Sequence, residues 1–103
     1  GKLARFGLKK LVTALPVELA LFNYSVSNNN VNLYWQTAEE INNRGFEIER
    51  TSNVNVHWNK IGFVEGRGTT NENQSYSFSD RNLNSGIYKY RLKQMDYNGK
   101  LLS

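Results

Sequence analysis

The sequence predicts an all-β fold in which two antiparallel sheets pack face to face. Apolar and polar residues alternate with a period of two over most of residues 17–96. Clusters of Asn, Gly and Ser separate the alternating segments about every ten to fifteen residues, a spacing typical of β-sandwiches. No segment as long as an average helix, about 12 residues, carries a helical stripe. One core between two sheets is therefore expected.

The first two expected strands flank a turn at Ser27–Asn30, where three asparagines follow a serine. The first expected strand, residues 17–26, begins where apolar and polar residues start to alternate. Residues 31–37 place three large apolar side chains on one face: Val31, Leu33 and Trp35. The turn should therefore separate two strands, and the second of them should bury one face.

The third expected strand, residues 45–51, alternates Phe46 and Ile48 with charged residues. A turn is expected before it at Asn42–Gly45, and Thr37–Asn43 has room for one helical turn. The pair Glu47 and Glu49, beside Arg50, should lie on a solvated sheet face.

The last three expected strands are residues 57–65, 75–79 and 86–96. A long loop at Gly66–Asn73 separates the first two, and Asn82–Gly86 precedes the third. In the last segment the stems of Lys89, Arg91 and Lys93 should cover the outer face while the tyrosines point inward.

The composition excludes most enzyme chemistry. The 103 residues include no cysteine and one histidine, His57, so thiol nucleophiles, disulfides, Cys-based metal sites and sites needing two histidines are ruled out. Gly66–Thr70 resembles a phosphate loop only superficially, because it lacks the Gly-Lys-Ser/Thr sequence and a following helix. We expect no enzyme activity, no catalytic residue, no cofactor and no metal.

The net charge of +4 is concentrated in residues 1–14. The remaining residues contain nine basic and nine acidic side chains. A nucleic-acid partner is not expected, because such proteins usually carry basic residues across a folded face. Membrane insertion is not expected either, since no apolar run reaches the roughly 18 residues that a span requires.

Two groups of residues resemble strands B and C and the tyrosine corner of fibronectin type III and immunoglobulin-like modules. The first is Val31–Trp35 followed by Gly45–Arg50, and the second is Leu83 followed by Tyr88. In that family the corner tyrosine donates its hydroxyl to a nearby backbone carbonyl. The resemblance implies a two-sheet sandwich spanning residues 15–103.

A more specific resemblance is to the fibronectin-like module near the C-terminus of bacterial surface proteins exported by the type IX route. It is carried by five segments: Leu15–Leu19, Glu39–Asn43, Ile61–Val64, Tyr76–Asp80 and Tyr90–Asp96. The resemblance implies an extracellular or cell-surface structural module of bacterial origin.

The final strand departs from the family pattern. Tyr97–Lys100 contains Asn-Gly, a strong hairpin signal, yet only Leu101–Ser103 follow. Three residues are too few to pair along residues 86–96. We therefore expect an unpaired sheet edge with an apolar slot beside it.

The basic segment 1–14 is a candidate for the strand that fills such a slot. As a strand it gathers apolar side chains on one face, with Lys10 the exception: Ala4, Phe6, Leu8 and Val12. The expected acceptor groove lies beside Tyr88, Tyr90 and Leu92. Because Leu15–Pro16 is a short connection, insertion into a neighbouring copy is easier than return to the same chain.

The expected function is a structural or adhesive subunit that assembles head-to-tail into a filament with copies of itself. The alternative is a non-catalytic spacer flanked by other domains of a larger secreted protein. Outward Tyr24, Tyr34 and Tyr97 would allow such a spacer to contact glycans.

Overall fold

The computed structural model describes residues 17–97 and 101–102, and these form an all-β, open antiparallel sheet. Its strands are β1 (Val17–Ser27), β2 (Asn30–Ser52), β3 (Asn59–Thr70), β4 (Gln74–Asp80), β5 (Tyr88–Asp96) and β6 (Leu101–Leu102). The predicted all-β class is confirmed, and the arrangement is compatible with a sandwich. Within the described residues no helix is long and apolar enough to cross a bilayer.

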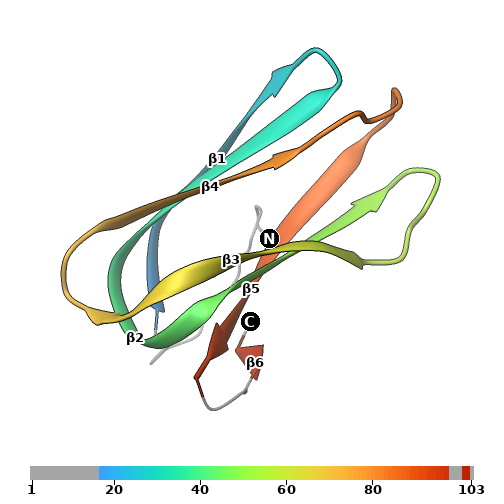
Figure 1. Cartoon of the computed structure of the whole chain (residues 1–103). Helices are drawn as coiled ribbons and strands as arrows, with labels where there is room; N and C mark the ends of the chain where they lie inside the picture. The colour runs from blue at the N-terminus through green and yellow to red at the C-terminus, as the bar shows by residue number, and fades with distance from the viewer. Residues whose placement is uncertain (1–16, 98–100, 103) are drawn as a thin grey trace.

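Strand β2, 23 residues long, organises the sheet. Its first part, residues 30–40, pairs with β1 on one edge and β4 on the other. Its second part, residues 43–52, pairs with β3 and β5. Figure 1 shows β2 bending where its colour passes from cyan to green. Between the two parts lies Asn42, whose φ is +56°. The bend turns the two parts of the sheet toward each other.

The core lies between these two parts. Leu33, Trp35 and Ile48 are fully buried. The Trp35 ring lies 5.5 Å from that of Phe46 and 5.7 Å from that of Tyr76, centroid to centroid. The predicted inward phase of the second and third expected strands is confirmed, because these rings come from both sides of the bend.

The prediction of two strands separated by a turn at Asn42–Gly45 is wrong, as is the single helical turn at Thr37–Asn43. One strand runs through both segments. Thr37, Glu40 and Asn43 are buried there, and Thr37 Oγ1 and Asn43 Nδ2 both donate hydrogen bonds to the Glu40 carboxylate. The Tyr76 hydroxyl and the Arg67 amide, which are distant in sequence, also donate to Glu40. These contacts keep the backbone extended through the bend.

Strand β3 is longer than expected. It continues to Thr70 because Gly68 pairs with Asn43 and Thr70 with Glu40. The expected loop at Gly66–Asn73 is thus confined to its last residues, and Gly66–Thr70 is strand rather than loop. Phe63 pairs with Glu47 on the outer face, and the guanidinium of Arg91 lies 4.3 Å from the centre of the Trp58 ring.

Candidate functional site

One edge of β5 is largely without a partner strand in the described part of the chain. The other edge pairs with β2 from Tyr88, opposite Ser52, to Asp96, opposite Asn43. On the open edge, β6 lies at the end of β5 (Figure 1) and pairs there with Gln94 and Met95. The expected unpaired edge is confirmed for the described residues. Its free backbone groups are those to which an added strand binds.

A groove of about 770 Å³ lies beside this edge, between β1 and β5. Phe22, Tyr24 and Val26 line it from β1, and Tyr88 and Tyr90 line it from β5. The β1 side chains come from the inner face of the sheet, because Tyr24 pairs with buried Leu33 and Val26 with buried Val31.

Tyr24 and Val26 are nevertheless 66% and 64% exposed. Their pairing partners in β2 are buried, so the exposure arises at the mouth of the groove rather than from the outer face. Uncovered apolar side chains on an inner sheet face mark a surface that a further segment can cover.

The predicted acceptor residues divide into two groups. Tyr88 and Tyr90 line the groove. Leu92 is not among the lining residues and packs against the core. The predicted donor residues Ala4, Phe6, Leu8 and Val12 lie outside the described residues.

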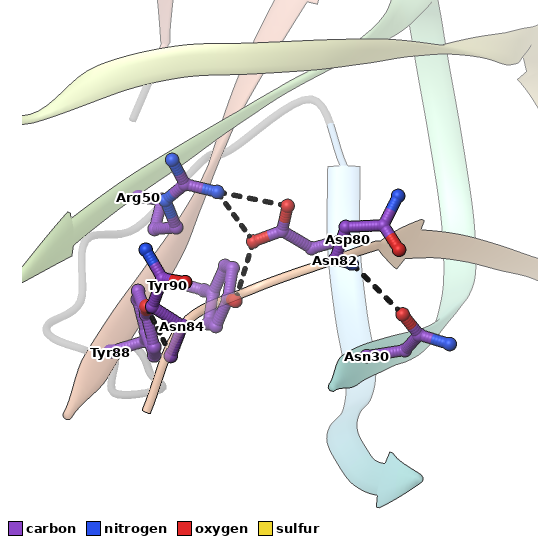
Figure 2. A network of polar contacts seen from close by, with 7 residues as sticks. All are labelled: Asn30, Arg50, Asp80, Asn82, Asn84, Tyr88 and Tyr90. Atoms are coloured by element: carbon purple, nitrogen blue, oxygen red, sulfur yellow. Dashed lines mark hydrogen bonds and ion pairs between the residues drawn. The ribbon is translucent and has the colours of Figure 1, made fainter. Parts of the chain in front are cut away.

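A carboxylate holds the groove wall in place. Figure 2 shows Arg50 and Tyr90 converging on Asp80, which accepts hydrogen bonds from Arg50 Nη1 at 2.8 and 2.9 Å and from the Tyr90 hydroxyl at 2.7 Å. Burial, and then the bond to Asp80, raise the pKa of Tyr90, so its hydroxyl stays protonated. The network joins β2, β4 and β5. Sequence reasoning missed it, since these residues are far apart in the chain.

The predicted tyrosine contact is present. The Tyr88 hydroxyl donates to the backbone carbonyl of Asn84 at 2.6 Å (Figure 2). The guanidinium of Arg50 lies 5.8 Å from the centre of the Tyr88 ring. These contacts orient the ring at the groove while it stays only half-buried.

The outer face of β5 is basic. Arg91 and Lys93 both pair with Glu49, at 2.6 and 3.3 Å, whereas Lys89 has no acidic partner among the described residues. Glu47 pairs with Lys60 at 3.6 Å. The expectation that Glu49 lies solvated beside Arg50 is wrong, because Glu49 is buried under these cations and Arg50 turns to Asp80.

No other cluster in the described part of the chain offers clear chemistry. Among those residues, no group of three His, Cys, Asp or Glu side chains could hold a metal ion. The three tyrosines proposed as a glycan platform do not share a face. Tyr24 faces the groove, Tyr34 pairs with Asn23 on the opposite face, and Tyr97 follows β5.

The comparisons with known proteins identify no relative. No protein-family model, no curated protein and no solved structure matches the chain.

Proposed function

We propose that the chain is a non-catalytic structural module of the extracellular or cell-surface kind, and that it assembles by accepting a strand along the open edge of β5. The single observation that carries the proposal is the exposure of Tyr24 and Val26 on an inner sheet face, beside an edge of β5 that is largely unpaired within the described residues. We further propose that the fold is a fibronectin- or immunoglobulin-like sandwich. The two-part sheet around β2 and the Tyr88–Asn84 contact support this.

The proposed donor is segment 1–14 of a neighbouring copy. Burial of Phe6, Leu8 and Val12 should contribute roughly 1.5–3 kcal/mol each. Ladder hydrogen bonds add about 0.5–1.5 kcal/mol each, against an association cost of about 4–15 kcal/mol. Arg5 and Lys9, on the other face of the donor, would approach the basic outer face of β5, at about 0.2–1 kcal/mol per pair. The apolar contribution is larger, so head-to-tail insertion is favoured.

The test compares assembly of four proteins by sedimentation velocity and negative-stain electron microscopy. They are the intact chain, a chain lacking residues 1–14, and two variants. Val26→Asp changes a side chain of the groove, and Ser25→Asp changes the adjacent side chain, which is also exposed. We expect oligomers or filaments from the intact chain and from Ser25→Asp only. Both substitutions fall at exposed positions, so unfolding curves should show that both variants fold.

Monodisperse monomers from the intact chain at all concentrations would overturn self-assembly. The second candidate function, a spacer within a larger secreted protein, would then remain. It is favoured by the register of β6, in which Leu102 lies opposite Gln94 and Leu101 opposite Met95. A strand that continued this register would run along the open edge toward Tyr88 and close the sheet without a second copy.

A further inference from the structure

We infer that the open edge of β5 selects an acidic donor: an extended strand with apolar side chains facing the groove and carboxylates at the alternate, outward positions. The inference rests on the proposed strand acceptance and adds the chemistry of the partner. It predicts that a partner strand of this kind binds more tightly than the basic segment 1–14 of a second copy.

The two faces of β5 differ in chemistry at the open edge. Tyr88 and Tyr90 face inward and line the groove, whereas Lys89 and Arg91 alternate with them, and the exposed Lys89 also borders the groove. Side chains of a strand added beside β5 must alternate in the same way, because successive residues of a strand point to opposite faces. Every second donor side chain therefore enters the groove, opposite Tyr24 and Val26, and the others lie beside the cations.

The outer face has too few acids for its cations. Glu49 forms ion pairs with both Arg91 and Lys93. Its side chain is only 10% exposed, because these two cations cover it. Lys89 is exposed and has no acidic partner among the described residues. Glu47 is engaged with Lys60 of β3, on the side of β2 away from the open edge.

Opposite charges on directly paired residues stabilise a sheet, and like charges destabilise it. Carboxylates opposite Lys89, Arg91 and Lys93 would supply the anions that this face lacks. The segment 1–14 offers Arg5 and Lys9 instead and contains no acid. An acidic strand from a different protein should therefore displace the segment from the groove and end any polymer at that copy.

The test titrates the full chain into three fluorescently labelled peptides and follows anisotropy. The first peptide alternates valine with glutamate, the second alternates valine with lysine, and the third has the composition of the first in two blocks. We expect the acidic alternating peptide to bind about tenfold more tightly than the basic one. The reason is that three cross-strand charge pairs are attractive with the acidic peptide and repulsive with the basic one. The block peptide should not bind, because it cannot present one apolar face.

Lys89→Gln and Lys60→Gln form a matched pair, since each removes one positive charge from the outer face of the sheet and only Lys89 lies on β5. We expect Lys89→Gln to weaken binding of the acidic peptide two- to fivefold, and Lys60→Gln to leave the affinity for this peptide unchanged.

Equal affinities for the acidic and basic peptides would overturn the charge selection while leaving strand acceptance intact. An equal loss in the two variants would also overturn it, because only the net charge would then matter. Failure of both alternating peptides to bind would overturn strand acceptance itself, and the inference with it.

Discussion

At the scale of single residues, Glu40 is a buried carboxylate whose hydrogen bonds are supplied by four donors. Thr37 Oγ1, Asn43 Nδ2, the Tyr76 hydroxyl and the Arg67 amide all donate to it, at 2.5–3.0 Å. Burial by itself would raise the pKa of Glu40, but the bonds from Tyr76, Asn43, Thr37 and Arg67 outweigh it. The pKa therefore lies below its ordinary value of 4.5.

A lowered folded-state pKa means that the ionised form is stabilised by folding. This contribution is present above pH 4.5 and is lost as the pH falls through the folded-state pKa of Glu40. We expect Glu40→Gln to lower the free energy of unfolding by about 1–3 kcal/mol at pH 7, because the amide leaves at least one donor unpaired.

Urea unfolding of both proteins at pH 7 and pH 3 measures the effect. The difference between them should shrink at pH 3, because Glu40 of the unfolded chain is protonated below pH 4.5 and the stability gained from the lowered folded-state pKa diminishes there. A difference that is the same at both pH values would show that the charge of Glu40 is not what the four donors require.

At the scale of the element, the bend of β2 depends on Asn42. Its φ of +56° lies in the left-handed region, which costs most side chains about 1–2 kcal/mol but which Asn and Gly tolerate. The Asn42 amide donates to Thr69 Oγ1 at 2.9 Å, and its carbonyl accepts from the Tyr97 amide at 3.1 Å. The bend is thus tied to β3 and to the residue that follows β5.

We expect Asn42→Ala to lower the free energy of unfolding by about 1 kcal/mol and Asn42→Gly to change it by less than about 0.5 kcal/mol. Denaturant unfolding provides the measurement. Asn73→Ala, at an exposed turn position with ordinary φ, is the control and should be neutral. Equal stabilities of the Ala and Gly variants at position 42 would refute backbone strain as the cause.

At the scale of the whole molecule, charge is divided between the basic segment 1–14 and a remainder with equal numbers of acids and bases. The acceptor edge in that remainder is itself basic on its outer face, at Lys89, Arg91 and Lys93. Self-assembly through the segment would therefore bring like charges together, although apolar burial drives it.

We expect assembly of the intact chain to strengthen as salt rises from about 0.05 to 0.5 M, because salt screens this repulsion. Sedimentation velocity at several salt concentrations measures it, and Lys89→Gln should reduce the dependence. Assembly that weakens with salt would contradict a like-charge contact between donor and acceptor.

Alternation predicted the strands and the inward phase of Leu33, Trp35, Phe46 and Ile48. It could not predict that β2 runs through Asn42, because Glu40 and Asn43 are satisfied by partners distant in sequence, such as Tyr76 and Gln94. It also could not predict that Phe63 lies on the outer face opposite Glu47, or that the Trp58 ring lies under the Arg91 guanidinium while bordering the groove.

By itself, the sequence determined the all-β class, since this follows from the local alternation of apolar and polar residues. Only the tertiary structure decided that Tyr24 and Val26 face an open groove and that Glu49 is shared by two cations. The physical reason is that alternation fixes which residues share a face, whereas burial and ion pairing depend on which other strand lies opposite that face.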